Sequence, residues 1–162
     1  MKFLSPAKLN LNLRVISKRN DGYHNLETTF QLIDLFDEMT FEESDRSIGI
    51  SCDGLEIEPE NNLIFKSLNA IKNYCEIDKG VQIHLKKIIP VGAGLGGGSS
   101  NAATTLIALN KIWGLNLSRE ELVKIGKSLG ADIPIFIYGK NAIAKGIGDV
   151  LLDVELRKNK FL

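Results

Sequence analysis

A glycine-rich segment between an apolar run and a helix-forming run most constrains how this chain can fold. Residues 90–101 read Pro-Val-Gly-Ala-Gly-Leu-Gly-Gly-Gly-Ser-Ser-Asn, with five glycines in seven consecutive positions. Glycine has no Cβ and adopts positive φ at little cost, so successive backbone N–H groups can converge on one point. A following helix adds unpaired N-terminal donors and the positive end of its dipole. The segment therefore predicts an anion site, with a phosphate chain as the expected ligand.

Other interpretations of the glycine run fit less well. A flexible linker is one alternative, but such linkers rarely lie directly between a well-patterned strand and a well-patterned helix. Residues 92–97 also satisfy the dinucleotide fingerprint, which needs an acidic residue at the end of a second strand about 20 positions on. A second helix begins there instead, near residues 112–120. A Walker loop is excluded because no Gly-Lys-Ser/Thr follows the last glycine.

Length and charge limit the class of protein. The chain has 162 residues, about one domain, and its 20 basic and 20 acidic residues cancel. A neutral chain lacks the broad positive field of a nucleic-acid or membrane-surface binder, so no nucleic-acid or membrane partner is expected and an anion must be held locally.

Cysteine and histidine usage argues against a disulfide or a metal centre. Cys52 and Cys75 fall in unrelated apolar patterns and are expected to be buried, reduced thiols. His24 and His84 are the only histidines, so no metal site is predicted. The N-terminal apolar stretch is too short for a signal peptide and no segment is long enough to span a membrane, so the expected location is the cytoplasm.

Strand and helix patterns alternate along the chain. From Lys8 to Val15 apolar and polar residues alternate, which predicts a strand with a leucine-rich face and a polar face. Further strands are predicted at 26–33, 38–43, 48–52, 81–89, 142–145 and 150–156, with turns at 18–22 and around Pro59. Helices are predicted over 64–75 behind Asn61 or Asn62 as cap, from Ser99 or Ser100 as cap to Gly114, and from the capping box at Ser118 to Gly130. The fold class is α+β, a mixed sheet packed against helices.

Three polar residues stand out in these patterns. Lys8 and its strand neighbours form either a solvated sheet face or a functional row, although two asparagines in a strand are unfavourable. Lys87 lies in the apolar row of its strand, as either a snorkelling edge residue or a ligand for charge. Asp132, two places before Pro134, has the local pattern of a helix N-cap.

Four segments together identify a resemblance. These are Ser5-Pro-Ala-Lys-Leu-Asn-Leu-Asn-Leu13, Asp21-Gly-Tyr-His-Asn-Leu-Glu-Thr-Thr-Phe30, the loop from Pro90 to Ala103, and Leu129-Gly-Ala-Asp-Ile-Pro134. In this order they resemble the GHMP small-molecule kinases. The first two segments are most similar to the branch that phosphorylates a cytidine-diphosphate-linked methylerythritol on the methylerythritol phosphate (non-mevalonate) route to isoprenoids. The resemblance implies a fold of the left-handed βαβ type seen in a ribosomal protein domain.

The resemblance also implies roles for residues. ATP, expected with Mg²⁺, would be held by the loop and by residues on the adenine side, namely Pro90, Val91, Gly92, Ala93, Gly94, Leu95, Gly96, Gly97, Gly98, Ser99, Ser100, Asn101, Asn62 and Lys87. Asp132 would accept the proton of the acceptor hydroxyl, with Lys8 beside it. An adjacent cation keeps such a carboxylate ionised and favours the developing alkoxide. Phosphoryl transfer needs mainly this positioning and charge stabilisation.

The acceptor side is expected to include residues of the first two strands. Asn10 would help to fix the acceptor, while Tyr23 would stack on the cytosine and His24 would bond to its edge. The alternative for Tyr23 and His24 is a turn pair packed under the sheet. Members of the family continue into a C-terminal domain, so residues 1–162 are expected to form the N-terminal, ATP-binding domain, with incomplete activity on their own. Two other functions stay open: another GHMP kinase, of the homoserine or mevalonate type, and a nucleotide-binding module without catalysis.

Overall fold

The computed structural model describes residues 1–18, 20, 22, 24–53, 62–146 and 150–155. Within them six strands form one sheet in the order β3-β4-β2-β5-β6, with β1 paired to β2 off this path. The strands are β1 (Lys2–Lys18), β2 (His24–Ser44), β3 (Ile48–Cys52), β4 (Gly80–Lys86), β5 (Ala142–Lys145) and β6 (Val150–Asp153). The helices are α1 (Leu63–Cys75), α2 (Gly97–Ile112), α3 (Arg119–Leu129) and α4 (Ile133–Tyr138).

The long strand β2 organises the sheet. It pairs antiparallel with β1 over its length, with β4 through residues 38–44 and with β5 through residues 28–30. β3 runs parallel to β4, and α1 connects the two strands. The sheet is therefore mixed and the expected α+β class is confirmed, whereas the handedness of the crossover stays a prediction.

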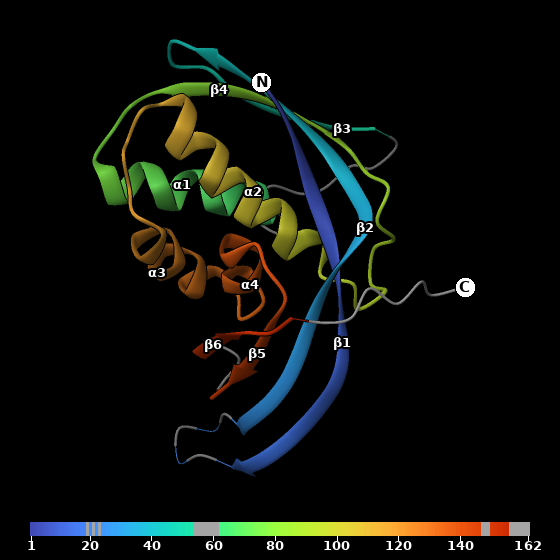
Figure 1. Cartoon of the computed structure of the whole chain (residues 1–162). Helices are drawn as coiled ribbons and strands as arrows, with labels where there is room; N and C mark the ends of the chain where they lie inside the picture. The colour runs from blue at the N-terminus through green and yellow to red at the C-terminus, as the bar shows by residue number, and fades with distance from the viewer. Residues whose placement is uncertain (19, 21, 23, 54–61, 147–149, 156–162) are drawn as a thin grey trace.

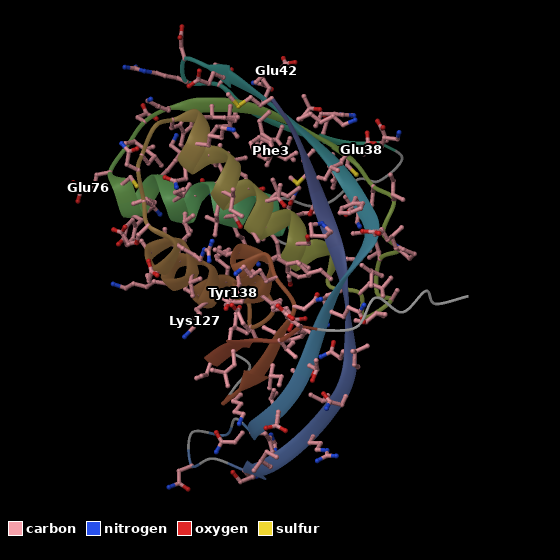
Figure 2. The ribbon with its side chains drawn as sticks, in the orientation of Figure 1. Phe3, Glu38, Glu42, Glu76, Lys127 and Tyr138 are labelled. Atoms are coloured by element: carbon pink, nitrogen blue, oxygen red, sulfur yellow. The ribbon has the colours of Figure 1, made fainter. Side chains whose placement is uncertain are left out.

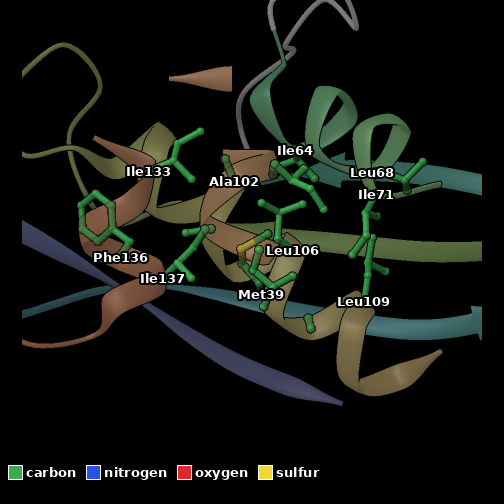
Figure 3. Packing of buried hydrophobic residues seen from close by; sticks show 14 of the residues in the cluster. Met39, Ile64, Leu68, Ile71, Ala102, Leu106, Leu109, Ile133, Phe136 and Ile137 are labelled. Carbon is green, nitrogen blue, oxygen red and sulfur yellow. The ribbon is translucent and has the colours of Figure 1, made fainter. Parts of the chain in front are cut away.

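The helices cover one side of the sheet. Figure 1 shows them gathered inside the curve of the β1–β2 hairpin, whose lower end extends past α3 and α4. Met39 and Phe41 of β2, Leu68 of α1, and Leu106 and Leu109 of α2 are fully or almost fully buried, and Figure 3 shows most of this cluster. On the other strand of the hairpin, Phe3, labelled in Figure 2, packs edge-to-face on Phe41 with ring centroids 5.5 Å apart. Burial of this apolar layer fixes α2 against the sheet.

Three helix boundaries agree with the signals expected from the sequence. Asn62 accepts a hydrogen bond from the Ile64 N–H and begins α1. Ser118 and Glu121 form the expected capping box of α3. Gly114, with φ of 64°, follows the end of α2. These signals are local, and the structure confirms each of them.

Several strand expectations are wrong in detail. The strand predicted at 81–89 ends at Lys86, where the pairing of β4 with β2 stops, and the strand predicted at 150–156 ends at Asp153. The predicted strands at 26–33 and 38–43 are one strand, because β1 continues to pair with β2 across a register shift between Pro6 and Ala7. The alternation from Lys8 to Val15 does not produce one buried face, since Leu13 is 60% and Val15 65% exposed. The reason is that β1 carries further register shifts and its second half extends beyond the helices.

The structure also bears on the expectations for the cysteines and for membrane-spanning segments. Cys52 and Cys75 are free thiols, but both are half-buried rather than fully buried. Among the described residues, no helix has the length and apolar character to cross a membrane. Residues 19 and 21 of the expected turn, the loop around Pro59 and the end of the last expected strand at Leu156 lie outside the described residues.

Candidate functional site

A cavity of about 610 Å³ lies over the glycine-rich segment. It brings together residues that are far apart in the sequence, from β1, the start of α1, the end of β4, the glycine-rich loop and the residue before α4. Its lining consists of Lys8, Asn62, Leu63, Ile64, Leu85, Lys87, Pro90, Val91, Gly92, Ala93, Gly94, Leu95, Gly96, Gly97, Gly98, Ser99, Asn101 and Asp132. A volume of this size suits a small organic ligand.

The loop depends on glycine for its backbone conformation. Gly92, Gly94 and Gly96 have φ of 76°, 73° and 72°, so every second residue lies in the left-handed region. At Gly92 and Gly94 a Cβ would meet nothing within 4 Å, which leaves open space above the backbone. The Leu95 carbonyl accepts the Lys8 N–H at 2.9 Å, and this bond ties the loop to β1.

Helix α2 begins without a side-chain cap. Its N-cap residue is Gly96, which offers no side-chain hydrogen bond, so the expected cap by Ser99 or Ser100 is wrong. The left-handed glycine lets the helix begin before the serines, which then fall inside its first turn. The first N–H groups of a helix have no intrahelical partner. Gly97, Gly98 and Ser99 line the cavity, so the unpaired donors and the positive dipole end are available to an anion there.

Lys8 is a buried cation on the wall of the cavity. Its side chain is 6% exposed, and the ammonium lies 3.2 Å from Asp132 Oδ2. It also donates to Asn10 Oδ1 at 2.5 Å and to the Gly94 carbonyl at 3.2 Å. These three acceptors use the three N–H donors of an ammonium. The ring of Phe30 lies below it, with its centroid 5.4 Å from Nζ. The solvated-face interpretation therefore does not hold for Lys8.

Asp132 directs its carboxylate to Lys8 rather than to a helix. It occupies the N-cap position of α4 but makes no side-chain cap hydrogen bond, and its backbone is helical (φ −87°, ψ −9°) rather than extended as at a typical N-cap. The carboxylate side chain is 39% exposed and borders the cavity. A paired, partly exposed carboxylate next to a cation can accept a proton from a bound hydroxyl group.

Lys87 is a second cation in the cavity. Its Nζ lies 2.7 Å from Oδ2 of Asp37, and its side chain is 13% exposed. A Cβ on Gly97 would lie 2.9 Å from the same nitrogen, so the ammonium rests directly against the first residue of α2. Lys87 is thus paired in the interior, which contradicts a snorkelling edge residue.

Asparagine and serine residues near the loop divide between the cavity and the core. Asn62 lines the cavity while its side-chain oxygen caps α1. Asn101 also lines the cavity, and its Oδ1 lies 2.8 Å from the Ser5 hydroxyl. Ser100 is completely buried and its hydroxyl contacts that of Ser5 at 2.8 Å, so it is not in the cavity lining. Ser100 therefore joins α2 to β1, and its side chain is directed away from any ligand of the loop.

Asn10 and His24, two of the expected acceptor residues, lie on β1 and β2. Asn10 contacts Lys8 and donates to the Thr28 hydroxyl at 3.0 Å. His24 begins β2, pairs with Lys18 near the end of the hairpin and does not line the cavity. Tyr23 lies outside the described residues. Within the described part of the chain, Asn10 is thus the expected acceptor residue that lies next to Lys8.

Sequence reasoning missed three polar residues that support the site. Ser5, Thr28 and Asp37 are buried, and all three make hydrogen bonds to residues of the site or of its loop. Asp37 had a usable signal, since strand alternation places it on the same face as Met39 and Phe41, and a carboxylate on an apolar face needs a partner. Ser5 and Thr28 had none, because short hydroxyl side chains are common on strand faces.

Cys52, at the end of β3, lies beside Leu85 of the cavity lining. Burial raises the pKa of its thiol, and the neighbouring Asp53 carboxylate raises it further. The thiol is therefore held protonated at neutral pH and is a poor nucleophile. Among the described residues, no three acidic, histidine or cysteine side chains come together to hold a metal ion.

Part of the chain that lines the cavity matches a known protein family. Residues 62–140, which include the glycine-rich loop and Asp132, match the family described as GHMP kinases N terminal domain. The chain carries a GHMP kinase N-terminal domain. The matched residues span α1, β4, the glycine-rich loop, α2, α3 and α4.

Curated relatives extend the likeness to the rest of the GHMP domain. The chain is 49% identical, over all of its length, to 4-diphosphocytidyl-2-C-methyl-D-erythritol kinase of Acinetobacter baylyi, of which it covers 59%. It is 51% identical to the kinase of the same name from Syntrophus aciditrophicus, over 93% of the chain and 54% of that relative. The chain thus spans little more than half the length of these relatives.

Solved structures confirm the fold. A crystal structure of 4-(cytidine 5'-diphospho)-2C-methyl-D-erythritol kinase superposes with a TM-score of 0.85 at 36% identity, covering 97% of this chain and 56% of that one. The mevalonate kinase of Methanococcus jannaschii superposes with a TM-score of 0.71 over 96% of this chain and 56% of that one. At 18% identity this second likeness concerns the fold alone.

Proposed function

We propose that this GHMP domain binds ATP in an enzyme that phosphorylates the 2-hydroxyl group of 4-diphosphocytidyl-2-C-methyl-D-erythritol. The curated relatives that carry this name, at about half identity, support the choice of acceptor. The observation that carries the proposal is the uncapped start of α2, which faces the same cavity as the Lys8–Asp132 ion pair.

The glycine-rich loop supplies the nucleotide side. Left-handed backbone at Gly92, Gly94 and Gly96 and the free N–H groups of the first helical turn suit phosphate oxygens. Asn62 lines the cavity at the start of α1, on the adenine side expected from the sequence. Lys87 was expected on the same side, but its Nζ rests against Gly97 at the start of α2 and therefore lies on the phosphate side. The whole chain is neutral, so this local arrangement of donors is what attracts the anion.

The Lys8–Asp132 pair supplies the acceptor side. Asp132 takes the proton of the acceptor hydroxyl, whose oxygen forms a bond to the γ-phosphorus as the bond from that phosphorus to the β–γ bridging oxygen breaks. ADP leaves with the electron pair of that bond. The Lys8 ammonium, 3.2 Å from the carboxylate, stabilises negative charge on the attacking oxygen. Asn10 holds Lys8 in place from the same strand.

Mg²⁺ fits this site as an ion that arrives with the nucleotide. The side-chain oxygens of the lining include the Ser99 hydroxyl and the Asp132 carboxylate, which would hold the ion together with phosphate oxygens and water. When bound, it neutralises charge on the phosphate chain.

Recognition of the cytidine end is proposed for Tyr23 and His24, with the tyrosine stacked on the base. Stacking of a base on an aromatic ring contributes about 1–3 kcal/mol, which is enough for selectivity. We further propose that a C-terminal domain of the family completes the acceptor pocket, so that the GHMP domain alone binds nucleotide but transfers phosphate slowly.

Calorimetric titration of the chain with Mg²⁺ and a non-hydrolysable ATP analogue tests the nucleotide part. Binding is expected at one site per chain. A titration that shows no binding at millimolar analogue would contradict the proposal.

Transfer from labelled ATP to a panel of acceptors tests the chemistry. The cytidine-linked acceptor should be phosphorylated, and homoserine and mevalonate should not. Asp132→Asn should reduce transfer by about 10²–10⁴-fold, the usual contribution of a positioned base, and leave analogue binding intact. Asp34→Asn, the same change at an exposed position of β2, is the control. Full transfer by Asp132→Asn would exclude this carboxylate as the base.

A further inference from the structure

Asp37 is a completely buried carboxylate that the proposed chemistry does not use. It lies on β2 next to Glu38, and Glu38 and Lys86 are the last pair of residues in the register of β2 against β4. The next residue on the β4 side is Lys87, where the chain leaves the sheet for the glycine-rich loop. The Asp37 side chain therefore stands where the ladder of main-chain hydrogen bonds ends.

Beyond the end of β4, the Asp37 carboxylate accepts main-chain hydrogen bonds in place of the backbone of a neighbouring strand. Oδ1 accepts the N–H groups of Ile88 and Ile89 at 2.7 and 2.8 Å. Neither residue belongs to a strand or helix, and Ile89 is buried, so its N–H would otherwise lack a partner. Asp37 thus fixes the backbone that leads into Pro90 and the loop.

The other carboxylate oxygen holds Lys87. Oδ2 accepts from Nζ at 2.7 Å, and Nζ also donates to the Ile89 carbonyl at 2.5 Å. An ammonium has three donors, so these two contacts leave one N–H of Lys87 for a ligand of the cavity. The contacts form a closed ring of Asp37, Lys87 and Ile89.

The position of the ammonium needs such an anchor. Nζ rests against Gly97 at the start of α2, where the helix dipole is positive and repels a cation. The buried negative charge of Asp37 offsets this repulsion. Without it, Lys87 would have an unpaired charge in the interior or would leave the helix start.

We propose that Asp37 is a positioning residue, which holds Lys87 and the entrance of the glycine-rich loop in place for the phosphate chain of the nucleotide. This inference rests on the proposed nucleotide-binding function. It places the effect of Asp37 on the phosphates rather than on the nucleoside or on the acceptor.

The test compares binding of a non-hydrolysable ATP analogue and of AMP by the chain. Asp37→Asn keeps an acceptor for the two N–H groups but loses the charge that holds Lys87. Since hydrogen bonds to charged groups contribute about 1.5–3 kcal/mol, the analogue should bind at least about 10-fold more weakly, with AMP binding unchanged. Asp34→Asn, on the exposed part of the same strand, should change neither affinity.

A second pair of variants shows whether Asp37 acts through Lys87. Lys87→Met should weaken analogue binding as Asp37→Asn does, and the double variant should bind the analogue no more weakly than Lys87→Met alone. The double variant has no unpaired buried charge, so it keeps the test available if Asp37→Asn does not fold. Equal losses for the analogue and AMP, no loss for the analogue, or additive losses in the double variant would each overturn the proposal.

Hydrogen exchange gives a readout that needs no nucleotide. Ile88 is 45% exposed and lies outside the sheet, so protection of its N–H from exchange depends on the hydrogen bond to Asp37. Asp37→Ala should speed exchange at Ile88 and Ile89, and unchanged exchange would contradict the positioning role. The unaltered chain could bind neither nucleotide while Asp37 still protects the amides of Ile88 and Ile89 from exchange. That result would contradict the proposed function but would support the positioning of the segment before the loop by Asp37.

Discussion

Gly96 is the position at which a single methyl group should disturb the candidate site most. It combines a left-handed backbone, φ of 72°, with close neighbours on two sides. A Cβ there would lie 2.8 Å from Cζ of Phe136 and 3.1 Å from Cε of Lys8. Phe136 is almost fully buried and Lys8 is held by three acceptors, so neither can move away freely.

Gly92 provides the matched control for this substitution. Its φ of 76° is nearly the same, but its Cβ would meet nothing within 4 Å. Gly92→Ala should therefore lose only the backbone term, about 1–2 kcal/mol for a non-glycine residue in the left-handed region. Gly96→Ala should lose this term and about 1–3 kcal/mol more from overpacking. The expected total for Gly96→Ala is about 2–5 kcal/mol of unfolding free energy.

Urea unfolding followed by the fluorescence of Trp113, the single tryptophan, measures both variants. The difference in unfolding midpoint at constant slope gives the difference in stability. Gly96→Ala should unfold at the lower urea concentration of the two. Equal midpoints would refute the close contact of Gly96 with Phe136 and Lys8, and wild-type midpoints for both would refute the left-handed backbone.

Two further predictions concern groups outside the loop. The backbone N–H of Ser118, and to a lesser extent its hydroxyl, form hydrogen bonds that lower the pKa of Glu121. The stability that this cap contributes is therefore present above the ordinary carboxyl pKa and is lost as the pH falls through the lowered pKa. Ser118→Ala should lower the unfolding free energy by about 1 kcal/mol. In urea titrations, the loss of unfolding free energy caused by Glu121→Gln should become smaller as the pH is lowered. A loss that does not change with pH would contradict the contribution of the ionised Glu121 to the cap. Because burial and Asp53 raise the pKa of Cys52, its thiol should react with iodoacetamide at neutral pH more slowly than free cysteine, and a faster rate, followed by mass spectrometry, would contradict this.

The sequence predicted best what depends on a few neighbouring residues. The caps at Asn62 and Ser118 involve atoms two or three residues apart, so local pattern is sufficient to predict them. The left-handed loop and the helix after it are likewise predictable from glycines between a strand and a helix, whereas the anion as its ligand stays a prediction. The motif resemblance then brought Lys8 and Asp132 together, and the structure has them 3.2 Å apart although 124 positions separate them in the chain.

What the sequence could not predict depends on contacts between distant segments. Asp37 and Lys87 are 50 residues apart, and only the register of β2 against β4 places them side by side. The leucine-rich row of β1 predicted a strand, but not that Leu13 and Val15 would be exposed. Strand alternation gives the two faces of a strand, whereas burial depends on how far the helix layer extends along it.

The wrong cap prediction for α2 has a functional explanation. By local rules Ser99 or Ser100 should begin the helix and satisfy one of its free N–H groups, which contributes about 1 kcal/mol. Instead Gly96 begins α2, Ser100 turns into the core toward Ser5, and the free donors of the first turn face a cavity. Local rules of this kind are broken mainly where a site needs the unsatisfied group. The same holds for Asp132, which leaves α4 uncapped and pairs with Lys8. Two helices thus lack a side-chain cap at one cavity, and the proposed ligand, which would accept hydrogen bonds at α2 and donate a proton to Asp132, would account for both exceptions.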